Sequence, residues 1–222
     1  YNHFKMMGFT PMPERGAEQS PNFEPLAVSL PNKIPASYIS RYIAELSCQN
    51  AGKSLCSRKE WYQACVGPNG PSPYFNEKGE EIFPESRPYG RMYQSEKCNI
   101  GLQSRWPPGI LGRANNWEML DPRISTLLGT DGLPMKRKTD SFPECTNEYG
   151  VYNMLGNVHE IVSDIRIATT FPKERVTYVG SHYARSSTES CAEATVDHWA
   201  PYTDYSLGFR CCTNITMGNI RH

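Results

Sequence analysis

The chain has 222 residues, which is enough for one large domain or two small ones with a real hydrophobic core. Its 23 basic and 23 acidic residues give a formal net charge of +0, and no basic run exceeds Lys136-Arg137-Lys138, so nothing indicates a nucleic acid or another polyanion as partner. No apolar stretch approaches the roughly 18 residues that a membrane-spanning helix needs.

Two helices are predicted in the first third of the chain. Residues 1–35 are rich in Pro, Asn and Ser and indicate loop. Pro35 opens the first helix, in which apolar residues recur at helical spacing, and Gly52 ends it. The second helix begins at Ser57-Arg58-Lys59-Glu60, which has the sequence of a capping box.

The rest of the chain predicts short strands within long loops. Residues 67–148 are polar and interrupted by Pro and Gly, so regular structure is expected to be scarce there. Segments 158–162 and 176–179 have the composition of short strands, and 207–212 that of a final strand. This pattern defines an α+β domain, which needs disulfides or metal ions because so much of it is irregular.

Cysteine is the strongest compositional signal. An even number of cysteines spread along the chain is typical of disulfides and of an oxidising compartment, so the protein is expected to be secreted, periplasmic or on the cell surface. No CxxC pair and no Cys/His cluster has the spacing of zinc ligands, which leaves zinc as the weaker alternative. The eight cysteines are Cys48, Cys56, Cys65, Cys98, Cys145, Cys191, Cys211 and Cys212.

The most unusual segment is residues 147–160, which combines Gly, Asn, Tyr and Glu within a few positions. Gly150 and Gly156 permit backbone conformations with positive φ. Asn153 and Glu160 offer oxygen ligands beside carbonyls that a tight turn would expose, and hard cations such as calcium are bound by such a mixture. The alternative is a hydrogen-bonded Asn/Gly turn that holds no metal.

Three blocks in chain order resemble the formylglycine-generating enzyme (sulfatase-modifying factor) family. The first covers 48–65, the second is 147–160, and the third joins Val-Gly-Ser at 179–181 to Leu-Gly-Phe-Arg-Cys at 207–211. The resemblance implies that family's C-type-lectin-like α+β fold, as one domain over residues 1–222. The family's opening Gly-Gly-x-Phe-x-Met-Gly strand is not found, which is expected if the chain begins inside a longer protein.

The resemblance also implies one or two structural calcium ions. The first ion would be held by two side-chain oxygens and two backbone carbonyls of the segment 147–160. The second would be held by an Asn-Ile pair and an Asp-Gly-Leu turn. Such ions brace loops and need not touch a substrate. The matching residues are Asn153, Gly156, Val158 and Glu160 for the first ion, and Asn99, Ile100, Asp131 and Leu133 for the second.

Two disulfides are implied by the same resemblance. One joins the first helix to the cysteine after Gly-Phe-Arg, and the other joins the second helix to the segment after Gly-Ser. Two further pairs are guesses for the remaining cysteines, one of them because both partners lie beside the expected calcium loops. The expected pairs are Cys48–Cys211 and Cys65–Cys191 by resemblance, with Cys98–Cys145 and Cys56–Cys212 as the guesses.

The resemblance fails at the catalytic centre. Family enzymes oxidise a substrate cysteine to formylglycine with copper(I), which is bound by two cysteines just after Gly-Gly-Ser, and soft thiolates suit that ion. The matching segment, residues 181–191, contains only Cys191, which already has a structural role. His159 stands where the family has Trp. Copper is therefore not expected, and His182 with Cys191 would be an improvised pair at best.

The sequence favours a non-catalytic binding or assembly module. Aromatic side chains with Ser, Thr and Asp form adaptable contact surfaces, and they gather in the loop-rich C-terminal third, although a place in the core is the alternative for them. The expected ligand is a protein or a glycan. Other functions stay open: a copper-dependent oxidase with a displaced site, a variable protein of the diversity-generating type, or a rigid structural block. The predicted ligand-contacting residues are His159, His182, Tyr183, Trp199, Tyr202 and Tyr205.

Overall fold

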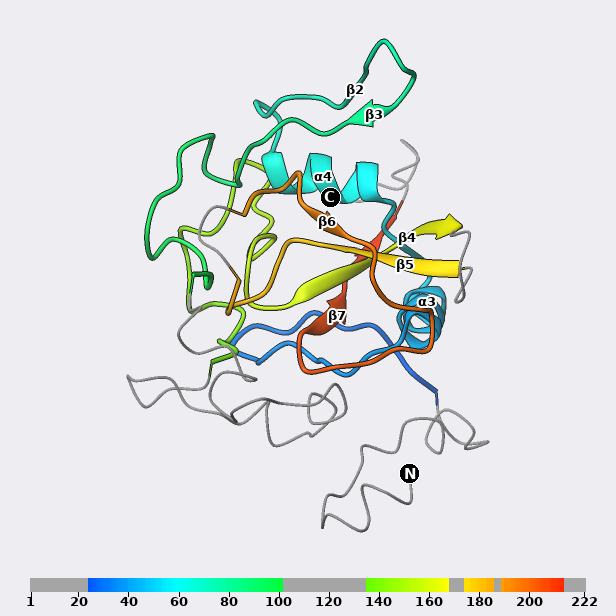
Figure 1. The fold of residues 1–222 in the computed structure, drawn as a ribbon. Coiled ribbons are helices and arrows are strands. Elements are labelled where there is room, and N and C mark those ends of the chain that lie inside the picture. Colours follow the sequence, from blue (N-terminus) through cyan, green and yellow to red (C-terminus); the bar gives the residue numbers. More distant parts are fainter. Residues whose placement is uncertain (1–23, 102–134, 168–173, 186–188, 214–222) are drawn as a thin grey trace, which may run out of the picture.

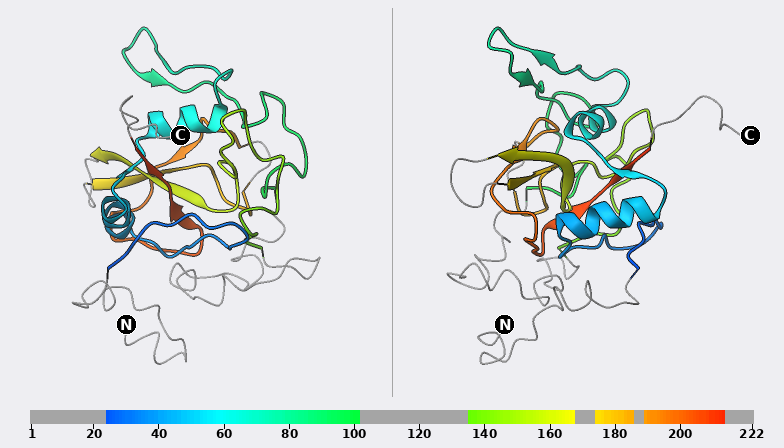
Figure 2. Two further views of the ribbon diagram at one scale, coloured as in Figure 1. Left: turned by 180° about the vertical axis from the view of Figure 1, so that it is seen from behind. Right: turned by 90° about the vertical axis from the view of Figure 1, so that its right-hand side faces the viewer.

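The structure, a computed structural model, describes residues 24–101, 135–167, 174–185 and 189–213. A sheet with the strand order β6-β5-β4-β7 forms its centre, and helices α4 and α3 lie on its two sides (Figure 1 and Figure 2). Strand β4 pairs antiparallel with β5 and parallel with β7. The strands are β4 (His159–Ile167), β5 (Glu174–Val179), β6 (Ala194–Thr195) and β7 (Leu207–Phe209).

The first helix, α3, spans Arg41–Asn50 and begins later than the predicted start at Pro35. Tyr38 explains the difference, because its φ of 61° lies outside the right-handed helical region. The helix begins after Ser40, whose hydroxyl accepts a hydrogen bond from the N–H of Ile43 at 3.3 Å. Ser40 is therefore the N-cap that the sequence pattern did not reveal.

The second helix, α4, spans Arg58–Val66 and has the predicted capping box. The hydroxyl of Ser57 accepts from the N–H of Glu60, and the carboxylate of Glu60 accepts from the N–H of Ser57 at 2.8 Å. These two bonds satisfy donors that the first turn of a helix otherwise leaves open.

Strands β4 and β5 have a hydrophobic core on each face. Successive side chains of a strand point to opposite faces. Ile161 therefore packs on the α3 side and Val162 on the α4 side, and Tyr178 and Val179 divide in the same way. Because both faces are covered, residues 159–162 are all buried, and two polar side chains, His159 and Glu160, are brought into the interior.

Four disulfides join segments that are far apart in the chain, with sequence separations of 163, 156, 126 and 47 residues. Two of them anchor β8 (Cys211–Cys212), which pairs with β1 (Ser54–Leu55) between the two helices. Closing loops this long contributes about 4–5 kcal/mol each in the chain-entropy model. The pairs are Cys48–Cys211, Cys56–Cys212, Cys65–Cys191 and Cys98–Cys145, the same four that the sequence analysis gives.

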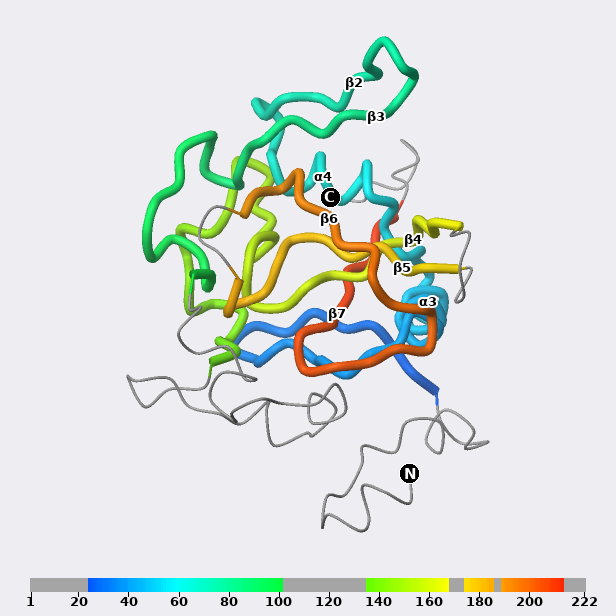
Figure 3. The backbone as a smooth tube through the Cα atoms, in the orientation of Figure 1, coloured from blue at the N-terminus to red at the C-terminus, as the bar shows by residue number. Residues whose placement is uncertain are grey.

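A short hairpin projects beyond α4, away from the central sheet (Figure 3). Its strands are β2 (Tyr74–Phe75) and β3 (Glu81–Ile82). Little regular structure was predicted for residues 67–148, and β2 and β3 are the strands that the structure has in the described part of this region. Among the described residues, no helix has the length and apolar character needed to cross a membrane.

Replacing Ser57 by Ala should remove one of the two capping bonds and lower the free energy of unfolding by about 1 kcal/mol. Urea unfolding of the oxidised protein would measure the loss. Ser72→Ala, at an exposed loop position, is the matched control. Equal losses in the two variants would contradict the capping role.

Candidate functional site

Two buried histidines lie side by side where the chain leaves β5. His159 is the first residue of β4 and His182 follows the end of β5, and their ring centres are 5.0 Å apart. Nδ1 of His182 accepts a hydrogen bond from the N–H of Ala184 at 3.3 Å. Tyr178 packs edge-on against His159, with 4.9 Å between ring centres. The segment after Gly-Ser is thus folded inward against the sheet.

A second group of rings continues this cluster. His198 stacks on Tyr202 with 3.6 Å between ring centres, and the Tyr202 hydroxyl donates to Asp204 at 3.0 Å. The carboxylate of Asp204 also accepts from the N–H and the hydroxyl of Ser206 at 2.7 and 2.8 Å. Burial raises the pKa of Asp204, and its hydrogen bonds to Ser206 and Tyr202 oppose that rise.

Both histidines of the pair are uncharged at neutral pH. Burial lowers the pKa of His159 to about 3, and the positive charge of Arg185 acts in the same direction. Burial, followed by the effects of His159 and Arg185, lowers the pKa of His182 well below its ordinary value. Desolvation disfavours the charged form of an imidazole, so these side chains act in the fold as polar but neutral rings.

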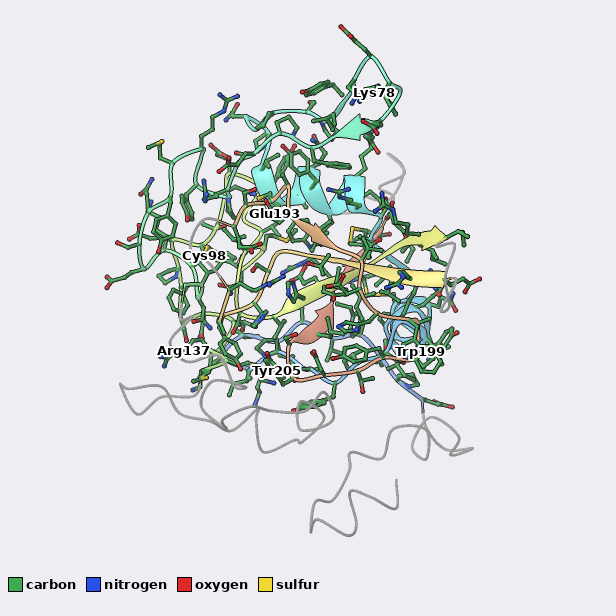
Figure 4. The ribbon with its side chains drawn as sticks, viewed as in Figure 1. Lys78, Cys98, Arg137, Glu193, Trp199 and Tyr205 are labelled. Carbon is green, nitrogen blue, oxygen red and sulfur yellow. A yellow bond between two sulfur atoms is a disulfide. The ribbon has the colours of Figure 1, made fainter. Side chains whose placement is uncertain are left out.

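Most of the predicted ligand-contacting side chains lie in this interior cluster. His159, His182, Tyr183 and Tyr205 are buried, and Tyr202 is half-buried. Trp199 is 44% exposed at the edge of the molecule (Figure 4). The structure therefore brings five of the six residues together as packing, and Trp199 is the one that offers a ligand an open surface.

The matching segment of the family's copper centre contains no thiolate here. Cys191 is bonded to Cys65, and all eight cysteines of the chain are paired. His182 and Cys191 therefore do not form the improvised copper pair, because a disulfide sulfur is not a thiolate ligand. What remains at this place is the pair of buried imidazoles and the rings that contact them, with the charge of Arg185 nearby.

The segment 147–160 forms a tight turn that is tied to two other loops. Asn153, Gly156 and Asn157 all have positive φ, and a side chain at Gly156 would overlap the backbone carbonyl of Asn99. Oδ1 of Asn157 accepts from Asn99 at 3.0 Å and from the N–H of Arg137 at 2.9 Å. These contacts match the alternative of a hydrogen-bonded Asn/Gly turn.

Glu160, the only carboxylate of the first predicted calcium set, is bound by two other side chains. Its Oε1 accepts from Nη2 of Arg210 at 2.7 Å, and its Oε2 accepts from Nε of Arg210 at 2.9 Å. Nε1 of Trp61 donates to the same Oε2 at 2.6 Å. A calcium ion here would have to share the single carboxylate with the guanidinium of Arg210, and the two positive charges would repel each other. The residues around Glu160 therefore do not fit calcium.

Only part of the second predicted calcium set lies among the residues that the structure describes. Asn99 and Ile100 are buried, and Nδ2 of Asn99 donates to the carbonyl of Met135 at 2.9 Å. Asp131 and Leu133 lie outside the described residues, so this set stays a prediction. In the ranges that the structure describes, no group of three or more His, Cys, Asp or Glu side chains is placed to hold a metal ion.

An open cavity of about 680 Å³ lies between the C-terminal end of α4 and the loops 86–91 and 146–148. Its volume falls within the roughly 300–1,000 Å³ of typical ligand pockets. Sequence reasoning missed it, because three separate segments form its walls. The side chains that give it chemical character are those of Asn69, Tyr89, Arg91 and Glu148, with Val66, Pro71 and Pro88 as apolar lining.

The fold and the site define a disulfide-braced α+β domain built around a buried carboxylate. A family model for the sulfatase-modifying factor enzyme 1-like domain matches residues 4–215, and the chain belongs to this family.

Among solved structures, the chain is similar to PvdO from Pseudomonas aeruginosa, with 19% identity and a TM-score of 0.47 over 82% of this chain and 62% of that one. It is also similar to CarF, with 14% identity and a TM-score of 0.37 over 97% of this chain and 80% of that one. The chain thus spans less than two thirds of the PvdO chain. A search of curated protein sequences gives no match.

Acid should destabilise the protein below the ordinary pKa of histidine. The folded state keeps His159 neutral while the unfolded chain binds a proton near pH 6.5, so stability rises with pH between about 3 and 6.5. His159 alone should lower the free energy of unfolding by about 2 kcal/mol at pH 5 relative to pH 7, and His182 should act in the same direction. Urea unfolding at the two pH values would measure the loss.

His159→Phe should show a smaller pH-dependent loss than the wild type, whatever its stability at pH 7. Tyr42→Phe, at an exposed position of α3, serves as the control and should keep the full loss. An unchanged loss in His159→Phe would show that this ring does not resist protonation in the fold.

Proposed function

We propose that the chain is a non-catalytic, disulfide-stabilised binding module on a formylglycine-generating-enzyme-like scaffold, working in an oxidising compartment. The observation that carries this proposal is the pairing of every cysteine. Copper(I) chemistry of the family depends on thiolates, and the segment that should supply them has its one cysteine in the Cys65–Cys191 bond. Four disulfides in one domain favour the oxidising compartment.

The open cavity beside α4 is the place that best suits a ligand. It offers a carboxylate, a guanidinium, an amide and a phenol ring within one concave surface, and Nδ2 of Asn69 donates to Glu148 at 3.3 Å across part of it. Pockets with apolar walls and a few polar groups are the usual form of a binding site. The proposed ligand is a segment of another protein or a glycan, and Trp199 is the competing contact surface.

A thiol count on the native protein tests the non-catalytic assignment. Alkylation under denaturing, non-reducing conditions should add no adduct to the intact mass, whereas reduction should expose all eight cysteines. Incubation with copper(I) and a cysteine-containing sulfatase peptide should leave the peptide mass unchanged. Two alkylated cysteines together with formylglycine in the peptide would restore the oxidase function.

Binding to a random peptide library and to a printed glycan array tests the location of the ligand. Arg91→Ala and Glu148→Gln should weaken the selected binder about tenfold or more, because each removes a charged contact from the cavity. Trp199→Ala is the matched variant on the other surface and should leave binding unchanged. Loss of binding in Trp199→Ala alone would move the site to the C-terminal aromatic loop.

A further inference from the structure

We infer that the guanidinium of Arg210 takes the place of the calcium ion expected beside Glu160, so that the 147–160 loop is braced by an ion pair built into the chain. This inference concerns the metal that the family resemblance implies, and it is independent of the proposed binding function. It rests on the contacts of three side chains, those of Trp61, Glu160 and Arg210.

The pair has the geometry of a strong, directional interaction. Nε and Nη2 of Arg210 each donate to a different oxygen of Glu160, which is the parallel, two-bond arrangement that suits a guanidinium and a carboxylate. The Glu160 side chain is 8% exposed and that of Arg210 is 31% exposed. A buried carboxylate needs a compensating charge, and Arg210 supplies it.

Arg210 also binds the loop itself. Its Nη2 donates to the backbone carbonyl of Tyr152 at 3.1 Å, and Tyr152 forms a β-bridge with Thr146 across the turn. The guanidinium thus links a carboxylate of β4 to a backbone carbonyl of the loop. Carboxylate and carbonyl oxygens are the groups that a calcium ion joins when it braces a loop.

The position of Arg210 is fixed by its neighbours in the chain. Cys211 follows it directly and is bonded to Cys48 of α3, while Phe209 before it belongs to β7. The covalent tie means that the guanidinium is present at Glu160 whenever the domain is folded. A dissociable ion has no such guarantee, so the loop should keep its shape where calcium is scarce.

Terbium luminescence on the folded, oxidised protein tests the inference directly. Terbium stands in for calcium, and Trp61 would sensitise an ion at Glu160 because its Nε1 lies 2.6 Å from the carboxylate. The wild type and Glu160→Gln should give the same emission, since any shared signal belongs to a site elsewhere. Emission from the wild type that Glu160→Gln abolishes would overturn the inference.

Removing the guanidinium should open the site to a cation. Arg210→Ala should melt several degrees lower than the wild type in chelator, and millimolar calcium should restore part of that loss. The double variant Arg210→Ala/Glu160→Gln should show no such gain. A calcium response of Arg210→Ala no larger than that of the wild type would contradict the equivalence of the two cations.

Two variants complete the experiment. Lys59→Ala breaks the surface Lys59–Glu81 pair and should leave the calcium response as in the wild type. Arg210→Lys keeps the charge without the two-bond geometry, and it should fold even where Arg210→Ala does not. Its terbium emission should stay at the wild-type level; a Glu160-dependent rise would show that charge at position 210 does not exclude a cation.

Discussion

The carboxylate of Glu160 is the point at which three distant parts of the chain meet. Trp61 comes from α4, Glu160 from β4 and Arg210 from the residue after β7, and all three are joined by hydrogen bonds of 2.6–2.9 Å. A buried carboxylate without a partner is strongly destabilising. If α4 or the C-terminal strand moved away from the sheet, Glu160 would lose a hydrogen-bond partner and the folded state would be less stable. The bonds of Cys211 and Cys212 to the two helical regions keep the same segments together when the chain is unfolded.

The two polar residues at the start of β4 are both buried, and the fold accommodates each of them in a different way. His159 and Glu160 are neighbours, so they point to opposite faces of a strand that is covered on both sides. Glu160 meets the guanidinium of Arg210, which sets an opposite charge beside it. His159 faces rings such as Tyr178 and has a pKa of about 3, so it stays neutral. Burial is similar for the two side chains, and the partner that each one meets is different.

The sequence predicted those features that depend on neighbours in the chain. The capping box of α4 and the strand segments around 158–162 and 176–179 are local patterns. The family resemblance implied the disulfides Cys48–Cys211 and Cys65–Cys191. The sequence did not predict that Arg210 would bind Glu160 or that Trp61 would join them, because these contacts span 50 and 99 residues. The start of α3 was also missed, since nothing in the residue type of Tyr38 indicates its positive φ.

The candidate site was predictable in composition but not in orientation. An aromatic side chain in a loop serves equally well as core or as contact surface, and here the double cover of the sheet turned all but Trp199 inward. The described rings after Gly-Ser are packed in the interior, and the molecule is open beside α4. Side chains that are already held in place lose less conformational entropy on association. The segment that matches the family's copper centre is tied to α4 by the Cys65–Cys191 disulfide, so a ligand bound beside that helix would meet walls that the disulfide already holds together.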